Sequence, residues 1–235
     1  MKVGNSIKVK NKNWSFGNGV PETFQDHVIK SVPGYLEGHN IVLELSDFFC
    51  HEKSNIYELG TSTAELISKI YKRHSHKKSI TFNGIDSEKE MINKAKMKCK
   101  KTNINLYNKD ITNFKFKKSD FIISYYTIQF IHPKIRQVLI NNIYESLNWG
   151  GGFVWFEKVR AADARFQDMT SNIYNNFKLN NGFSHEEILN KTNSLKGVME
   201  PFSSKGNLDL LKRAGFEDIL TIYKNICFEG LICIK

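Results

Sequence analysis

The stretch Asn55-Ile-Tyr-Glu-Leu-Gly-Thr-Ser-Thr63 combines a short apolar run with a single glycine at its end. Such a run is typical of a buried strand that is followed by a tight turn. The residues from Thr61 to Arg73 carry apolar side chains at helical spacing, so we expect a helix there. A strand, a glycine turn and a helix in this order form the first half of a βαβ unit.

The alternation of strand and helix repeats along the chain. Further strands are predicted at 79–86, 104–108, 120–124 and 153–156, and helices from Ser87 to about Lys101 and over 133–147. Ser87 followed by Glu90 indicates a capped helix start, and residues 148–152 should end the second helix. This alternation predicts an α/β fold with a mostly parallel sheet, whose ligand crevice lies at the carboxyl ends of the strands.

Helices are expected on both sides of this alternation. Apolar spacing predicts helices over 20–30 and 35–50, so residues 1–50 should form a helical cap. Residues 161–198 are purely helical in pattern, and we expect an insertion that serves as a lid or a dimer surface. After a helix over 207–213, two β-rich runs at 219–223 and 227–234 predict an antiparallel hairpin at one edge of a seven-stranded sheet.

Length and composition indicate an ordinary globular protein. The chain of 235 residues is 40% hydrophobic, which predicts a single domain over residues 1–235. No uncharged apolar run approaches the ~20 residues that a membrane span needs. Residues 1–14 lack the apolar region of a secretory signal, and the four cysteines show no CxxC spacing. We therefore expect a cytoplasmic protein with reduced thiols, without membrane contact and without a metal site.

The charge of the chain is strongly positive. Lys and Arg number 34 against 24 Asp and Glu, for a net charge of +10. Eleven of the cations fall between Lys69 and Lys101. Such a basic balance is compatible with nucleic-acid binding, but no zinc-finger spacing, RNP-like aromatic box or clear helix-turn-helix accompanies it. A solvated basic face is the preferred interpretation, and direct nucleic-acid binding stays open as the alternative.

Residues at the ends of the first three predicted strands indicate the ligand. Of the G-x-G-x-x-G pattern that binds a dinucleotide only Gly60 is present, and no Walker A loop occurs, so a phosphate ligand is disfavoured. S-adenosylmethionine has no phosphate. Asp86 could accept both ribose hydroxyls, while Asp110 and Ile111 could meet the edge and the face of the adenine. Together these residues predict the Rossmann-like fold of class I S-adenosylmethionine-dependent methyltransferases.

Beyond these motifs, the chain resembles the bacterial carboxy-S-adenosylmethionine synthases. Members of that family have this fold and act in the tRNA wobble-uridine 5-oxyacetate pathway. The resemblance covers the chain from Trp14 to its end and is most specific at Ser31-Val-Pro-Gly-Tyr35 and Thr127-Ile-Gln-Phe130. Shorter matches are Trp14-Ser-Phe16, Arg136-Gln137, Ile143-Tyr144, Leu147-Asn148, Glu157-Lys158, Asn181-Gly182, Glu187-Ile188 and Ala214-Gly-Phe216.

The resemblance implies roles for individual residues. Tyr35 matches a tyrosine that reaches the cofactor, and the loop Gly60-Thr-Ser62 matches a Gly-Cys-Ser loop. Asp86-Ser87 and Asp110-Ile111 match the pairs at the ribose and the adenine. The implied cofactor-binding residues are Tyr35, Glu58, Gly60, Thr61, Ser62, Asp86, Ser87, Asp110, Ile111 and Tyr125. The implied cofactor is S-adenosylmethionine or its carboxylated form.

Two positions depart from the family pattern. Tyr125 stands where the family has Asn, and Thr192 stands where it has the Arg that holds the extra carboxylate of the product. A guanidinium binds a carboxylate bidentately, and a threonine hydroxyl cannot replace its charge. Such a loss costs on the order of 2–5 kcal/mol. Lys191 and Lys196 are close in sequence and could compensate.

Three functions remain as alternatives. The missing Arg favours ordinary methyl transfer from S-adenosylmethionine to an unidentified small-molecule acceptor, with Tyr35, Tyr125, Gln129 and Thr192 as candidate catalytic residues. The second alternative is the family reaction, in which S-adenosylmethionine and prephenate give the carboxylated cofactor and phenylpyruvate. The third is a non-catalytic S-adenosylmethionine-binding subunit. Because members of this family form homodimers, the resemblance also implies a homodimer.

Overall fold

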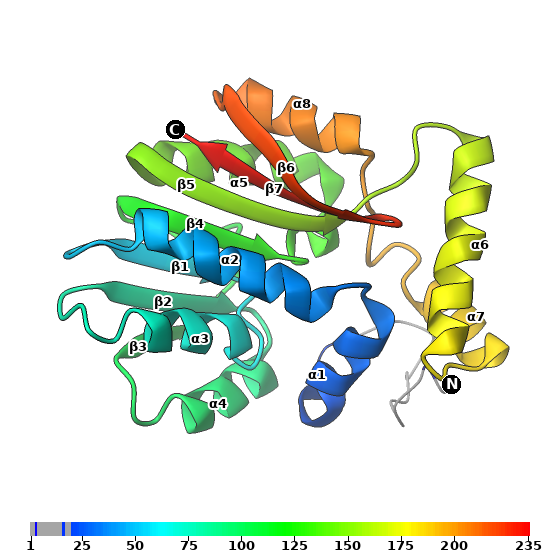
Figure 1. The fold of residues 1–235 in the computed structure, drawn as a ribbon, viewed down its shortest axis with the longest axis horizontal. Coiled ribbons are helices and arrows are strands. Elements are labelled where there is room, and N and C mark those ends of the chain that lie inside the picture. The colour runs from blue at the N-terminus through cyan, green and yellow to red at the C-terminus, as the bar shows by residue number, and fades with distance from the viewer. Residues whose placement is uncertain (1–2, 4–15, 17–19) are drawn as a thin grey trace.

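The computed structural model describes residues 3, 16 and 20–235 (Figure 1). The expectation for residues 1–14 therefore lies, apart from Val3, outside the described residues, and so do Trp14 and Ser15 of the resemblance. The description below concerns the remainder of the chain.

Seven strands form one sheet in the order β3-β2-β1-β4-β5-β7-β6. Their bounds are β1 Asn55–Leu59, β2 Thr81–Asp86, β3 Ile104–Asn108, β4 Ser119–Tyr125, β5 Leu147–Lys158, β6 Asp218–Asn225 and β7 Phe228–Ile234. Neighbouring strands are parallel except where β7 pairs with β5 and with β6. The prediction of a seven-stranded, mostly parallel sheet with an antiparallel hairpin at one edge is confirmed.

Helices surround this sheet. They are α1 Val20–Ser31, α2 Tyr35–Phe49, α3 Glu65–Arg73, α4 Lys89–Lys98, α5 Pro133–Ser146, α6 Ala164–Asn180, α7 His185–Ser194 and α8 Ser204–Ala214, with a short 3-10 helix η1 at Ile128–Phe130. The predicted pair of N-terminal helices is present as α1 and α2. The predicted helical insertion is present as α6 and α7.

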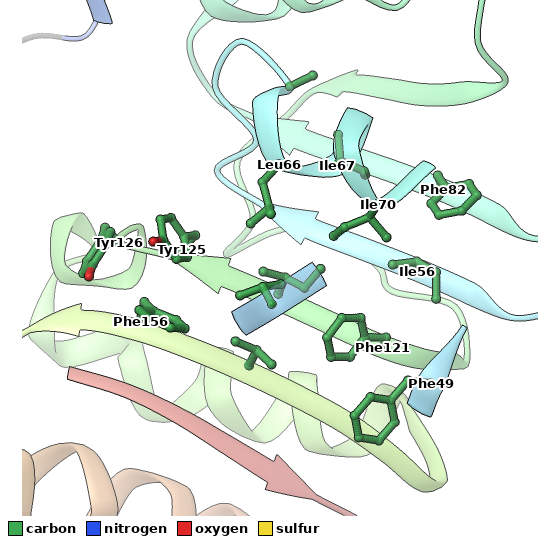
Figure 2. Close-up of a cluster of buried hydrophobic side chains, with 14 of the residues drawn as sticks. Phe49, Ile56, Leu66, Ile67, Ile70, Phe82, Phe121, Tyr125, Tyr126 and Phe156 are labelled. Atoms are coloured by element: carbon green, nitrogen blue, oxygen red, sulfur yellow. The ribbon is translucent and has the colours of Figure 1, made fainter. Parts of the chain in front are cut away.

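The core consists of two apolar layers on opposite faces of the sheet. Side chains alternate between the faces along each strand, so the adjacent residues Ile122 and Ile123 of β4 belong to different layers. Helices α2, α3 and α4 cover one face and α5 and α8 the other. Figure 2 shows the first layer, in which Ile70 of α3 packs on the face of the sheet and Tyr125, Tyr126 and Phe156 cluster at one end.

Three local predictions differ from the structure. Helix α3 begins at Glu65 rather than Thr61, because Gly60, Ser62 and Ala64 have positive φ and cannot continue a right-handed helix. Ser87 does not cap α4; the N-cap is Glu88. The run 148–152 ends α5 as expected but itself belongs to β5, because Gly150 and Gly151 exchange backbone hydrogen bonds with Lys235.

The carboxyl ends of the parallel strands all face one side of the molecule, and α1, α6 and α7 gather there (Figure 1). The Tyr174 hydroxyl of α6 donates to the Ser31 carbonyl at the end of α1, at 2.8 Å, and so fastens the insertion to the N-terminal cap. The fold thereby places a helical roof over the edge of the sheet where ligands of α/β proteins bind. None of the helices in the described part of the chain is both long and apolar enough to span a bilayer.

One close contact lets us test the packing of α2 on the sheet. A Cβ at Gly38 would lie 2.2 Å from the Tyr125 hydroxyl and 3.0 Å from the Phe156 ring, and both rings are buried. Gly38→Ala should therefore lower the free energy of unfolding by about 1–3 kcal/mol, which urea denaturation would measure. Gly206→Ala in α8 is the control, because its Cβ would meet only ordinary contacts; it should be neutral or stabilising. An equal effect of the two changes would contradict this packing.

Candidate cofactor and substrate site

A cavity of about 680 Å³ lies between the carboxyl ends of the strands and the helical roof. Ten predicted site residues line it: Tyr35, Gly60, Ser62, Asp86, Ser87, Asp110, Ile111, Tyr125, Gln129 and Thr192. The other two, Glu58 and Thr61, line a separate recess of about 40 Å³ beside the same loop. The structure therefore brings together residues that are spread over more than 150 positions of the sequence.

The turn after β1 requires a glycine for two reasons. Gly60 has φ +70°, a conformation that side chains disfavour, and a Cβ there would lie 2.2 Å from the Thr127 hydroxyl oxygen. That hydroxyl donates to the Leu59 carbonyl at 2.9 Å and fixes the loop after β4 against the loop after β1. The chain can therefore pass close to the cavity at this point, as a cofactor-binding turn needs.

Glu58 and Thr61 support this loop from inside the protein. The Thr61 hydroxyl donates to a Glu58 carboxylate oxygen at 2.5 Å, and the same oxygen accepts from the backbone amide of Ile67 at 3.3 Å. Burial raises the pKa of Glu58 to about 8. The two side chains thus join the loop to the first turn of α3, and neither reaches the main cavity.

Asp86 ends β2 and faces the cavity. One carboxylate oxygen accepts from the backbone amide of Ser62 at 2.8 Å, and the other accepts from that of Glu88 at 2.9 Å. Burial raises the pKa of Asp86, while these two amides oppose the shift. The carboxylate is therefore held in one orientation, and each oxygen keeps lone-pair capacity for a ligand hydroxyl.

The residues expected at the adenine follow β3. Ile111 is buried, and Asp110 is exposed at the cavity margin. One Asp110 carboxylate oxygen accepts from both the amide and the hydroxyl of Thr112, at 2.8 Å each, which holds the turn. Ser87 lies at the same margin and is exposed. An apolar face and a carboxylate edge lie side by side here, as a purine requires.

Three of the tyrosines that line the cavity, Tyr35, Tyr125 and Tyr126, make an aromatic wall. The Tyr125 hydroxyl donates to the Tyr35 carbonyl at 2.6 Å, and the two rings meet edge to face. Burial raises the pKa of Tyr35 and of Tyr125. Tyr126 has φ +59°, an unusual conformation for a bulky side chain that often marks a functional site. With pKa values raised in this way, Tyr35 and Tyr125 stay protonated, so no phenolate is available there to act as a general base.

The side-chain amide of Gln129 makes hydrogen bonds within the protein. Its NH₂ group donates to the Tyr126 carbonyl at 3.2 Å, and its oxygen accepts from the Lys158 amide at 2.9 Å. The buried Glu157 carboxylate accepts from the Gln129 amide at 3.1 Å. Gln129 therefore joins η1 to the end of β5 and positions the cavity floor, which gives it a structural use that the sequence did not reveal.

Several lysines reach the cavity: Lys191 and Lys196, which the sequence offers as substitutes for the missing Arg, and Lys158 and Lys178, which sequence reasoning did not assign. Lys158 at the end of β5, Lys178 on α6 and Lys191 on α7 all line the cavity, and burial lowers the pKa of each. Thr192 on α7 lines it too, with its hydroxyl donating to the Ile188 carbonyl at 2.8 Å. Lys158 could have been found at the end of a predicted strand, whereas Lys178 has no local signal within its helix.

The two halves of the cavity carry different charged groups. Asp86, Glu88 and Asp110 supply carboxylates near the ends of β2 and β3, whereas the half under α6 and α7 combines lysines with two acids, Glu187 and Glu200, which already have partners in Ser184 and Arg160. S-adenosylmethionine fits the first half, because its ribose hydroxyls and adenine need acceptors while its sulfonium is repelled by cations. The second half suits an anionic group close to the cofactor.

The position of Asp86 yields a prediction about cofactor affinity. Asp86→Asn should weaken S-adenosylmethionine binding at least tenfold, or about 1.4 kcal/mol, because it removes the charge and one acceptor. Asp120→Asn is a matched control: Asp120 also accepts two hydrogen bonds, from Asn55 and Asn148, but at the opposite end of the sheet. Calorimetry should show unchanged affinity for the control. Wild-type affinity in Asp86→Asn would contradict the ribose assignment.

Known proteins are similar to this chain in sequence. A family model described as a methyltransferase domain matches residues 56–151. A carboxy-S-adenosyl-L-methionine synthase from Staphylococcus epidermidis is 37% identical over 226 residues, which cover 94% of this chain and 97% of that protein. A protein of the same name from Campylobacter lari is 31% identical over 95% of each chain.

Solved structures give the same fold. The plantazolicin methyltransferase superposes with a TM-score of 0.65 at 14% identity, covering 91% of this chain and 90% of that one. The prediction of a class I S-adenosylmethionine-dependent methyltransferase fold is confirmed, and so is the family resemblance. The chain is a S-adenosylmethionine-dependent enzyme and belongs to the carboxy-S-adenosyl-L-methionine synthase family.

Proposed function

We propose that this enzyme makes carboxy-S-adenosylmethionine from S-adenosylmethionine and prephenate. The observation that carries the proposal is that Lys158, Lys178 and Lys191 line the same cavity as the carboxylates of the cofactor half. The relatives that share nearly the whole chain bear the name of this activity. Thr192 in place of an Arg favours ordinary methyl transfer, but the lysines bring cationic charge to the same cavity.

The chemistry balances without an oxidant or a metal. The cofactor supplies an activated methyl group on sulfur, and prephenate supplies the carboxyl group of its ring. One methyl C–H bond and the ring C–CO₂ bond break, and a new C–C bond forms between the methyl carbon and CO₂. The ring hydroxyl leaves with the methyl proton as water, and the aromatic product is phenylpyruvate.

The protein contributes position and charge rather than a proton acceptor. Asp86 and the Gly60 turn hold the cofactor, and the aromatic wall of Tyr35 and Tyr125 closes one side. Lysines keep the anionic substrate and the newly formed carboxylate beside the methyl carbon. Fixing two reactants at contact distance is worth ~7–11 kcal/mol in favourable cases. The helical roof keeps bulk water from the cavity while CO₂ is transferred.

A homodimer through the insertion accompanies this proposal. Phe166, Met169 and Ile173 recur along one face of α6 and are about half exposed, and Leu189 of α7 is exposed as well. An apolar stripe at this spacing suits a helix that packs against a second chain. We place the enzyme in the cytoplasm, in keeping with its four unpaired, buried cysteines.

The basic stretch between Lys69 and Lys101 is explained by ion pairs and solvation. Arg73 pairs with Asp47, Lys94 with Glu22 and Lys98 with Glu65. These contacts favour the solvated basic face over a dedicated nucleic-acid surface. The substrate is then a small molecule, and the role in tRNA modification is indirect, through the product.

Mass spectrometry of ligand extracted from the purified enzyme tests the function. We expect carboxylated cofactor after incubation with S-adenosylmethionine and prephenate, together with one phenylpyruvate per turnover. The Asp86→Asn variant is the control and should give less of both products at a cofactor concentration below the wild-type Kd. Plain S-adenosylmethionine or its demethylated form, without loss of prephenate, would contradict the proposal. Demethylated cofactor formed with another acceptor would favour methyl transfer.

Thr192→Arg tests the departure from the family. A guanidinium placed at this cavity position should raise affinity for the carboxylated cofactor, by roughly tenfold or more for one added charge-assisted pair. Affinity for S-adenosylmethionine should not rise, because its sulfonium is repelled by the new charge. Thr192→Gln is the control of similar length without the charge. Equal affinities of the two variants for the carboxylated form would show that this position does not contact the carboxylate.

A further inference from the structure

Two lysine amines lie against the ring of Tyr174 inside the cavity. The Nζ atom of Lys158 is 4.4 Å from the ring centroid and that of Lys178 is 4.3 Å from it. The two side chains come from the end of β5 and the last turns of α6, so they meet only in the folded protein. The Tyr174 ring is held in place by its hydrogen bond to Ser31 and by edge-to-face packing on Phe228.

These amines are removed from water without gaining an acidic partner. Lys178 is 7% exposed, and within the described part of the chain neither Lys158 nor Lys178 makes an ion pair with a carboxylate. Cation–π contact with the tyrosine offsets only part of the cost of removing each amine from water. A buried charge of this kind is costly unless it is paired, so the pair of amines is arranged for an anion that comes from outside the chain.

Other charged groups around the amines are used elsewhere or add positive charge. Lys191 on α7 faces Lys178, and Arg160 after β5 faces Lys158. Among the acids that line the cavity under the roof, Glu187 accepts from the amide and the hydroxyl of Ser184, and Glu200 pairs with Arg160 at 3.6 Å. The Cys227 thiol also faces both amines, and burial raises its pKa, so it stays neutral.

We propose that Lys158, Tyr174 and Lys178 form the clamp that binds a carboxylate of the second substrate. This inference rests on the proposed function and names the residues that select its acidic substrate. The apolar side chains of Val159, Phe183 and Phe228 line the same part of the cavity, so the favoured ligand carries its carboxylate on a hydrophobic ring or chain.

The clamp should make substrate binding depend on pH. Burial, followed by the neighbouring charge of Lys158, lowers the pKa of Lys178 to about 8. A lysine binds a carboxylate only in its protonated form, so the contribution is complete well below pH 8 and is lost as the pH rises through that value. Between pH 7 and pH 9 the protonated fraction falls about tenfold, and affinity for the acid should fall by the same factor.

Calorimetry with prephenate tests the clamp on the full-length enzyme. The enzyme is saturated with S-adenosylhomocysteine, which has no methyl group to react. Lys178→Gln should bind prephenate at least tenfold more weakly than wild type at pH 7 and should lose the pH dependence. Lys178→Arg should keep most of the affinity and extend it to pH 9. Lys212→Gln on the outer side of α8 is the matched control and should behave as wild type.

The outcomes separate the clamp from the proposed function. Affinity of Lys178→Gln equal to that of wild type, with carboxylated cofactor still formed, overturns the clamp alone. Prephenate binding with the expected pH dependence, but no carboxylated cofactor, supports the clamp and overturns the proposed function. Absence of both binding and product overturns both. Unchanged S-adenosylhomocysteine affinity and unfolding midpoint in the variants show that the loss is local, whereas a parallel loss of both would mean that Lys178 only supports the fold.

Discussion

The carboxylate of Asp86 is the contact on which the cofactor half of the site depends. Its two oxygens accept the backbone amides of Ser62 and Glu88, and so tie the end of β2 to the loop after β1 and to the start of α4. Three segments meet at one half-buried acid. The loop can come this close only because Gly60 tolerates a positive φ beneath the Thr127 hydroxyl. The same acid that orders the loop is then available to a ribose.

Much of this arrangement is readable from the sequence. The apolar runs at 55–59 and 120–124 predict buried strands. Because parallel strands end at one edge of a sheet, Gly60, Asp86 and Asp110 are predicted to lie close together. The edges of the elements are harder to predict. Helix α3 starts late because two residues of its predicted first turn, Ser62 and Ala64, have positive φ. Strand β5 starts early because Lys235, nearly ninety residues away, supplies hydrogen-bond partners. Ser87 has the right chemistry for a cap but its neighbour Glu88 occupies the position.

The half of the cavity that lies under α6 and α7 could hardly be predicted from sequence patterns. Tyr125 and Gln129 are polar residues beside a ligand crevice, which suggests chemistry, yet their polar atoms serve the backbone of Tyr35, Tyr126 and Lys158. Lys178 sits in a helix rich in polar residues and differs from them only in its burial. Its role emerges from tertiary contacts, since β5 and α6 must meet before the two amines share one ring. The net charge of +10 bears on the function only through the lysines that are buried in the cavity.

The central claim is that the enzyme moves the ring carboxyl group of prephenate to the methyl carbon of S-adenosylmethionine. The most direct test uses prephenate labelled with ¹³C in that carboxyl group, with mass spectrometry of the cofactor after turnover. We predict a carboxylated cofactor one mass unit heavier than the product from unlabelled prephenate. A cofactor that carries no label, or that is recovered only in its demethylated form, would contradict the account.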